Sequence, residues 1–400
     1  MKFTDCTPRN EEMINTNFAN KDKASYFHIS PLIVRTKENS IVRIKSDFSY
    51  ISLVGEYHIL INPYYDYSYV PFNLYKDHIL RIHAENGELN FCYRFETEQL
   101  YKITIAEPTE DGYRLVCSAE VYALDDDLFH LKPLIGDLHC HTTYSDGFES
   151  PELVLRSAAK KHLDFLAITD HNNYQGSVAA AQIRENDQIP ITVIHGEEIA
   201  SPFTKMHILS LGGNKSVSET VSSTEVYKEC SSEYDHICRL VDDIHATEGI
   251  AVMCHPLWKV FIRDGSRWDV PLSTVTKLLN NNIFDAVEVV SGSQHGDIMS
   301  SNIMHTIACE YGNDTAYIGV TDSHMYSTDQ IAGKHITFVF AENNTEVDIV
   351  NAIREKRTTA IEIEDHNNVL CFGSLRISLF AQFFVRSIYL RKNENAGGII

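Results

Sequence analysis

The feature that most constrains the fold is a change of pattern near residue 133. Beyond this point, short apolar runs typical of buried strands recur at 165–169, 191–194, 207–211, 250–253, 286–290 and 317–320. Amphipathic stretches lie between them, such as 234–247 and 301–311. A further helix is expected to begin at Ser150-Pro151-Glu152, because Ser suits the N-cap and Pro suits the first turn. Strands that alternate with helices predict a parallel sheet or a closed β/α barrel.

The residues before 133 have a different texture. Runs rich in Val, Ile, Tyr and Phe predict strands at 40–44, 57–61, 78–83, 89–95, 101–106 and 113–122. Asn86-Gly87 and Asp111-Gly112 are typical hairpin turns between such strands. We therefore expect three segments, which are a small all-β sandwich-like domain over 1–132, an α/β barrel over 133–366, and a C-terminal packing segment with a frayed tail over 367–400.

Charge and cysteine content restrict the partners and the compartment. The chain has 34 basic and 55 acidic residues, a net charge of −21, which disfavours nucleic acid and anionic membranes as partners. Nine cysteines without a CxxC pair predict reduced thiols in the cytoplasm. The N-terminus lacks the pattern of a secretory signal, and the apolar stretch 375–390 contains Arg376 and Arg386, so we expect no membrane segment.

Polar clusters stand next to the predicted strands beyond residue 133. Most follow a strand, and one, His207, begins a strand. In closed α/β barrels the carboxyl ends of the strands carry the active site. Imidazoles and carboxylates that converge there are what a site for several metal ions requires. The clusters are His139-Cys140-His141, Asp170-His171, His195-Gly196-Glu197-Glu198, His207, Cys254-His255-Pro256 and Thr321-Asp322-Ser323-His324.

These clusters resemble the motifs of a known family. The stretch from Gly136 to Gly147, GDLHCHTTYSDG, closely resembles the first motif of the PHP (polymerase and histidinol phosphatase) superfamily. Ile168-Thr169-Asp170-His171-Asn172, Gly196-Glu197-Glu198-Ile199, His255-Pro256 and Asp322-Ser323-His324 resemble its later motifs, in the family's order. The resemblance covers about residues 134 to 365. A β domain joined directly to the first motif is more similar to the CehA/McbA-like metallohydrolase branch, named for carbaryl hydrolase.

The resemblance implies a fold, a ligand set and a chemistry. The fold is a distorted seven-stranded β/α barrel that holds two or three divalent metal ions, for which Mn, Zn and Fe suit the ligand types. A hydroxide held between the metals would be the nucleophile. The implied ligands are His139, His141, Glu198 and Asp322 for one metal, Glu198, His207 and His255 for a second, and Asp146, His171 and His324 for a third.

Further residues are candidates for supporting roles. Asp170 could orient a neighbouring histidine, and Glu288 could face the metals or pair with a buried base. Glu198 is preferred to Glu197 as the ligand because Ile199 follows it, so Glu197 is expected on the other strand face. By the same alternation Cys140 and Cys254 are expected to face away from the metals. Candidates for substrate contacts are Trp258, Lys259 and Arg263.

The favoured function is a metal-dependent hydrolase, and most of all a phosphoesterase that acts on a small phosphorylated molecule. The metal ligands equally suit a carboxyl-ester or carbamate hydrolase, which the CehA-like resemblance would permit. A third reading, from another class, is a metal-stabilised binding protein without catalysis. The sequence leaves the substrate, the metal identity and the oligomeric state open.

Overall fold

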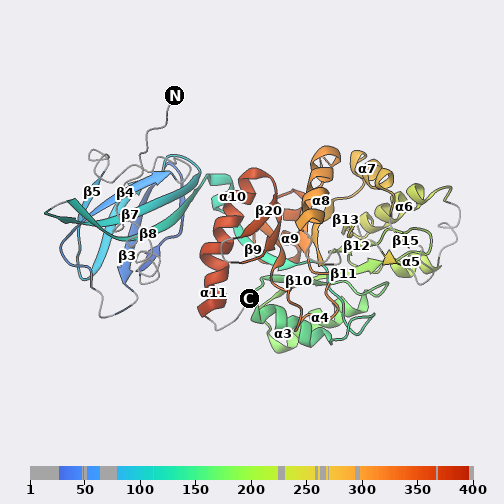
Figure 1. The fold of residues 1–400 in the computed structure, drawn as a ribbon. Coiled ribbons are helices and arrows are strands. Elements are labelled where there is room, and N and C mark those ends of the chain that lie inside the picture. Colours follow the sequence, from blue (N-terminus) through green and yellow to red (C-terminus); the bar gives the residue numbers. More distant parts are fainter. Residues whose placement is uncertain are drawn as a thin grey trace, which may run out of the picture. The chain divides into compact units, whose positions relative to one another are not determined.

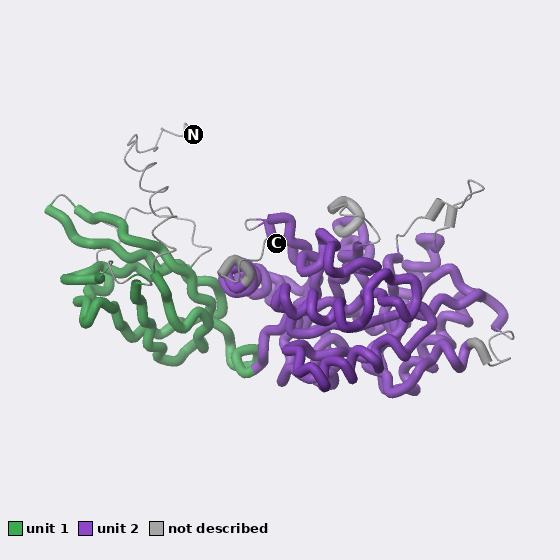
Figure 2. The backbone as a smooth tube through the Cα atoms, turned by 90° about the horizontal axis from the view of Figure 1, so that it is seen from below, with its two compact units in different colours: residues 1–130 green, residues 131–400 purple. Residues whose placement is uncertain are grey.

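The structure is a computed structural model that describes residues 27–46, 48, 52–63, 79–110, 112–223, 230–256, 260–261, 267–268, 270–292, 298–312, 314–365 and 368–395. The chain forms two compact units, Met1–His130 and Leu131–Ile400 (Figure 2). No helix in the described ranges combines the length and the apolar character needed to cross a membrane.

The described residues of the first unit form two β-sheets and one short helix. One has the strand order β1-β3-β6 and the other β2-β8-β7-β4-β5. Asn86 and Gly87 form a tight turn between β5 and β6, with left-handed φ angles of 54° and 79°. The sequence predicted a hairpin here, but β5 and β6 pair with other strands in different sheets, so the turn links the two sheets instead. The elements are β1 (Phe27–Ser30), β2 (Ile33–Arg35), β3 (Asn39–Ser46), β4 (Glu56–Pro63), β5 (Leu80–His83), β6 (Glu88–Arg94), β7 (Gln99–Thr109), β8 (Gly112–Leu124) and α2 (Asp126–Phe129).

The second unit is built on one sheet of ten strands, in the order β17-β16-β13-β12-β11-β10-β9-β18-β19-β20. The strands are β9 (Lys132–Asp137), β10 (Phe165–Ile168), β11 (Thr192–Ile199), β12 (Ile208–Leu211), β13 (Ile250–Met253), β16 (Ala286–Ser291), β17 (Ala316–Val320), β18 (His335–Ala341), β19 (Thr358–Ile363) and β20 (Val369–Gly373). A separate two-stranded ribbon joins β14 (Val260–Phe261) to β15 (Arg267–Trp268).

This sheet curls until its ends nearly meet. Thr337 on β18 donates its hydroxyl to the carbonyl of Gly319 on β17 at 2.8 Å, although β17 is an end strand of the order. The chain after β17 also pairs with the chain after β9 through an isolated bridge between Cys140 and Ser323. The result is a barrel-like sheet of ten strands, where the family resemblance implied seven. The apolar run of β18, HITFVFA, was not among the strands expected from the sequence.

Strand direction within the barrel explains where polar side chains meet. β9, β10 and β11 run parallel, as do β13, β16 and β17. β12 is antiparallel to both β11 and β13. A strand of reversed direction begins where its parallel neighbours end, so the start of β12 lies at the carboxyl ends of β11 and β13.

Helices cover the sheet and close its apolar core. In α3, the Ser150 hydroxyl accepts from the Leu153 amide and Pro151 occupies the first helical position, as the sequence predicts. α3 and α4 lie side by side below β10 and β11 (Figure 1). The helices are α3 (Pro151–Lys160), α4 (Gln175–Asp187), α5 (Ser218–Ser223), α6 (Glu233–His245), α7 (Leu272–Asn280), α8 (Ile298–Tyr311), α9 (Glu346–Arg354), α10 (Leu375–Phe384), η5 (Val385–Tyr389) and α11 (Leu390–Asn395).

Candidate metal centre

The carboxyl ends of the barrel strands bring the predicted polar residues together. His139 and His141 follow β9, His171 follows β10, and His255 follows β13. Asp322 and His324 follow β17. Two backbone hydrogen bonds join the first and the last of these loops, from the His141 amide to the Ser323 carbonyl and from the Asp322 amide to the His139 carbonyl, both at 2.9 Å. Loops far apart in sequence are thus fixed against each other.

The centre of the cluster is the carboxylate of Glu198, which is fully buried. Five histidine ring nitrogens lie within 3.2 Å of its two oxygens. Burial alone would raise the pKa of Glu198, but the surrounding histidines, His139 foremost, hold that pKa well below its usual value. The ring nitrogens come from His139 at 3.1 Å, His141 at 3.2 Å, His171 at 3.1 Å, His207 at 2.7 Å and His255 at 3.1 Å.

His207 reaches this cluster because β12 runs against its neighbours. It immediately precedes Ile208, the first residue of β12, and Ile208 pairs with Ile199 of β11 and with Met253 of β13. The residue before an antiparallel strand therefore stands level with the residues that end the parallel ones. The strand pattern of the sequence marks His207 only as the start of a strand, and the antiparallel register of β12 places it at the cluster.

A second part of the cluster joins His139, His141 and Asp322. One Asp322 carboxylate oxygen lies 3.0 Å from Nε2 of His141 and 3.2 Å from Nε2 of His139. Burial lowers the pKa of His141, but its bonds to Asp322 and Glu198 outweigh burial and raise that pKa to about 9. Asp322 has a φ angle of 51°, and strained backbone of this kind is concentrated at functional sites.

Gly292 makes room for the turn that carries Asp322. A Cβ atom at Gly292 would stand 1.7 Å from the carbonyl oxygen of Thr321, so no larger residue fits without a backbone shift. The Thr321 side chain in turn donates to the carboxylate of Asp137 at 2.6 Å. The position of Asp322 is therefore fixed by packing on one side and by a buried hydrogen bond on the other.

A third group, made by Asp146, His171 and His324, is more open. One Asp146 carboxylate oxygen lies 3.4 Å from Nε2 of His324, and the other lies 3.7 Å from Nε2 of His171. Nδ1 of His141 is 3.8 Å from the first oxygen. The Asp146 side chain is 57% exposed, so this side of the cluster faces solvent.

Buried carboxylates outside the ligand set hold the cluster in shape. One oxygen of Glu288 lies 2.6 Å from Nδ1 of His139, and the other accepts from the His255 amide at 2.7 Å. Because a carboxylate only accepts, Nδ1 of His139 carries the proton and Nε2 presents its lone pair to the cluster. Asp137, which sequence reasoning missed, accepts from the backbone of His139 and Thr321, although burial raises its pKa to about 7.

Two further carboxylates, Asp170 and Glu197, bond to loop and helix residues and not to the histidines. Asp170, considered from sequence as a partner of a histidine, accepts instead from the Thr142 amide and hydroxyl and from the Ser145 hydroxyl. It therefore shapes the loop that carries Asp146. Glu197 points away from Glu198 and accepts from the amides of Val217 and Ser218 at the start of α5.

The two cysteines beside the histidines behave differently. The Cys140 thiol donates to the Ala167 carbonyl at 3.3 Å, on the β10 side. Cys254 was expected to face away from the cluster, but its sulfur lies within 4.8 Å of ligand atoms of both Glu198 and His255. Cys254 shares a core cluster with Ile250 and Val252, as regular alternation along β13 requires, but the positive φ of 20° at His255 breaks the alternation after it, so Cys254 and His255 do not face opposite ways.

The spacing of these atoms fits divalent metal ions. Metal–nitrogen and metal–oxygen bonds of about 2.1 Å place neighbouring ligand atoms about 3.0 to 3.4 Å apart. Nε2 of His139 and Nε2 of His141 are 3.2 Å apart, and both face carboxylate oxygens at similar distances. The buried Nδ1 of His141 has no hydrogen-bond partner within the described part of the chain. A cation between the two Nε2 atoms and these oxygens would bind all of them, while Nδ1 of His141 faces Asp146 on the other side of the ring.

The three substrate contacts predicted from the sequence belong to the loop that follows His255. Trp258, Lys259 and Arg263 lie outside the described residues. The described part of the same loop resumes in the ribbon of β14 and β15.

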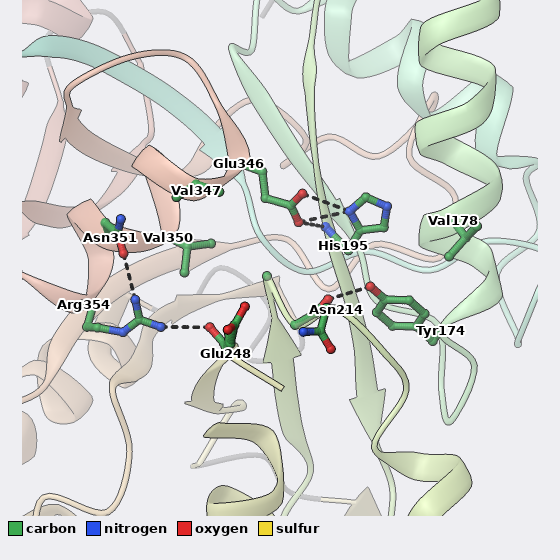
Figure 3. Close-up of a pocket in the computed structure, with 12 residues that line it drawn as sticks. Tyr174, Val178, His195, Asn214, Glu248, Glu346, Val347, Val350, Asn351 and Arg354 are labelled. Carbon is green, nitrogen blue, oxygen red and sulfur yellow. Dashed lines mark hydrogen bonds and ion pairs between the residues drawn. The ribbon is translucent and has the colours of Figure 1, made fainter. Parts of the chain in front are cut away.

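A separate cavity of about 600 Å³ lies away from the cluster (Figure 3). His195 and Glu346 both line this cavity, and Nδ1 of His195 lies 3.0 Å from the Glu346 carboxylate. The Tyr174 hydroxyl, also in the lining, donates to the Gly213 carbonyl at 2.6 Å. Arg354 lines the opposite side. His195 therefore belongs to this cavity, whereas Glu198, three residues further along β11, belongs to the cluster of histidines and carboxylates.

Comparison with known proteins identifies part of the chain. The chain is 28% identical over 183 residues to the uncharacterized protein MJ1587 of Methanocaldococcus jannaschii, a match that covers 42% of this chain and 87% of that protein. It is 37% identical over 83 residues to the phosphoribosyl 1,2-cyclic phosphate 1,2-diphosphodiesterase of Eggerthella lenta. That match covers 20% of this chain and 31% of the relative, less than a third of its length.

The chain is also similar to a solved structure, a two-domain protein from Bacteroides vulgatus that contains a predicted PHP-like metal-dependent phosphoesterase. The alignment covers 64% of this chain and 71% of that protein, at 18% identity and a TM-score of 0.44. Residues 137–299 match the PHP domain family. This range includes His139, Glu198 and His255 and ends before Asp322. Residues 137–299 are thus similar to the PHP domain, in a match that covers less than half of the chain.

Proposed function

We propose that this chain is a metal-dependent phosphoesterase that hydrolyses a small phosphorylated molecule. The observation that carries the proposal is the surrounding of one buried carboxylate, Glu198, by five histidine ring nitrogens within 3.2 Å. So many unscreened polar groups would be costly to gather in a buried site unless cations compensate them. The proposed catalytic segment is the barrel over 133–366.

The proposed ligands divide into three groups around Glu198. When bound, divalent metals activate water and neutralise charge on the phosphoryl oxygens. Mn, Zn and Fe all suit a set of imidazoles and carboxylates. The groups are His139, His141, Glu198 and Asp322, then Glu198, His207 and His255, then Asp146, His171 and His324.

The chain's own residues would orient this set. Glu288 keeps the proton of His139 on Nδ1, so that Nε2 is free to act as a ligand. Asp137 and Thr321 hold the loop of Asp322 against the loop of His139. Asp146, more than half exposed, stands on the side from which a substrate can approach.

The matched relatives support phosphate-ester chemistry. One is named as a diphosphodiesterase of a cyclic phosphate, and two others, from Salmonella typhimurium and Escherichia coli, are named as 5'-3' exoribonucleases. Each match covers about a third or less of the relative. The net charge of −21 favours a small phosphorylated substrate over a nucleic acid.

The test pairs metal content with turnover. The full chain, loaded with Mn²⁺ or Zn²⁺, is analysed for bound metal and assayed on a panel of phosphate, carboxyl and carbamate esters. We expect two to three metals per chain and phosphate release, both lost in His139→Ala. His195→Gln is the matched control, because His195 lies on the strand of Glu198 but in the separate cavity.

Other outcomes would redirect the proposal. Cleavage of only carboxyl or carbamate esters would replace the phosphoesterase by an esterase of the carbaryl-hydrolase type. Failure to bind metal under any loading condition would overturn the site assignment, and with it both the phosphoesterase and the metal-stabilised binding protein.

A further inference from the structure

The loops next to the metal cluster expose large apolar side chains. Phe148 is 74% exposed, Met325 is 46% exposed and Tyr144 is 41% exposed. Single exposed apolar residues are common, but these three lie in the loops that carry Asp146, His171 and His324 or are bonded to them, which indicates a contact surface. We call Tyr144, Phe148 and Met325 the apolar rim.

Backbone contacts place the apolar rim beside the Asp146, His171 and His324 group. The Phe148 amide donates to the His324 carbonyl at 2.8 Å, so Phe148 lies next to the His324-Met325 pair. Tyr144 is held on the other side, because its carbonyl accepts from the Asn173 side chain at 2.7 Å, two residues beyond His171. Asp146 stands between Tyr144 and Phe148 in the loop. The rim therefore borders the more open part of the cluster.

Cations are scarce in the same loops. The described segments 142–149, 169–175, 200–206 and 321–328 contain one, Lys205. Recognition of several phosphate groups requires several cationic or amide donors. These four segments therefore offer few cationic contacts to a second phosphate, and their exposed surface suits an uncharged apolar group. Lys259 and Arg263, the cations expected from the sequence, lie in the loop after His255, outside the described residues.

We propose that the substrate carries a single phosphate on an apolar group, aromatic or branched, that packs against the apolar rim. This inference rests on the proposed phosphoesterase function and names the substrate class of the same site. The phosphate would lie at the metal cluster, and the apolar group would cover Phe148 and Met325. Aromatic and thioether side chains are effective partners for such a group, because they offer a large contact area with few polar atoms.

The test compares two esters whose leaving groups have similar reactivity, 2-phenylethyl phosphate and ethyl phosphate. In the Mn²⁺-loaded full chain we expect kcat/KM for the phenylethyl ester to be greater by about 10-fold or more. Phe148→Ala should bring the ratio close to one, through a loss of kcat/KM for the phenylethyl ester. Phe148→Leu should keep most of the preference. Leu375→Ala, in which an equally exposed residue (74%) at the start of α10 is truncated, should change neither value.

Binding of 2-phenylethylphosphonate and ethylphosphonate, which are not hydrolysed, separates this inference from the proposed function. Hydrolysis of both esters at equal kcat/KM, with equal binding of the phosphonates, would overturn the apolar substrate class and leave the phosphoesterase intact. A third outcome is that neither ester is hydrolysed, but 2-phenylethylphosphonate binds more tightly than ethylphosphonate and Phe148→Ala abolishes that difference. This result would overturn the phosphoesterase and support the apolar rim. A preference that survives in the Phe148→Ala, Met325→Ala double variant would remove the rim as its cause.

Discussion

Glu288→Gln should weaken metal binding although Glu288 is not among the proposed ligands. Its two oxygens face two donors, Nδ1–H of His139 at 2.6 Å and the His255 amide at 2.7 Å. A glutamine has one oxygen and one NH₂ group, so one of these donors would meet another donor in a fully buried place. Such an unsatisfied contact costs about 1–3 kcal/mol. Loss of the charged partner of a ligating histidine typically lowers metal affinity about 10- to 100-fold.

The assay is competition for Zn²⁺ or Mn²⁺ with a chelator of known affinity. We expect the metal dissociation constant of Glu288→Gln to rise about 10- to 100-fold, which corresponds to about 1.4 to 2.7 kcal/mol. Glu197→Gln is the matched control, because Glu197 is equally buried but bonds to Val217 and Ser218, away from the cluster. That variant should lose stability and keep its metal affinity. Equal effects of the two substitutions on metal affinity would refute the reasoning.

Three more predictions test the fold and the site. Burial lowers the pKa of His335 to about 4 in the folded chain, whereas the pKa in the unfolded chain is about 6.5. Between these two pH values only the unfolded chain protonates His335, so the free energy of unfolding falls as the pH drops. From pH 7 to pH 5 the wild type should lose about 2 kcal/mol more than His335→Asn in urea titrations, and equal losses would exclude His335 as the cause. Gly292→Ala should destabilise the fold by about 2–4 kcal/mol in the same titrations, because its Cβ would stand 1.7 Å from the Thr321 oxygen, and an unchanged midpoint would contradict that packing. Removal of metal by EDTA should lower the thermal midpoint by about 5–10 °C, and His139→Ala should be insensitive to EDTA.

The sequence anticipated those elements whose signals are local. The start of α3 follows from Ser150 and Pro151, whose capping roles depend on neighbouring residues alone. β13 was expected at its observed bounds, 250–253. By contrast, β18 and β19 were missed, because a short apolar run looks the same in a buried strand and in a buried helix. Only the pairing of β18 with β9, and of β19 with β18, distinguishes the two.

The same division holds at the cluster. Alternation along a strand separates Glu197 from Glu198, and the structure places them on opposite faces. Alternation could not anticipate that Cys254 lies near the cluster, because the backbone departs from strand geometry at His255. Nor could it reveal the bond of Asp137 to Thr321, whose partners are 184 residues apart in sequence. Asp137 stands two residues before His139 in the first motif, and that spacing is the signal that could have found it.

The pairing of the first and last loops of the barrel has a consequence for the order of events as the chain is synthesised. His141 and Asp322 are 3.0 Å apart in space and 181 residues apart in sequence. At translation rates of about 5–20 residues per second, His139 and His141 leave the ribosome about 10 to 40 seconds before Asp322 does. Throughout that interval the early histidines lack their late partners. Metal uptake at the complete site is therefore expected to be a late step. It follows the docking of the loop after β17 against the loop after β9, which costs chain entropy because the two loops are far apart in sequence.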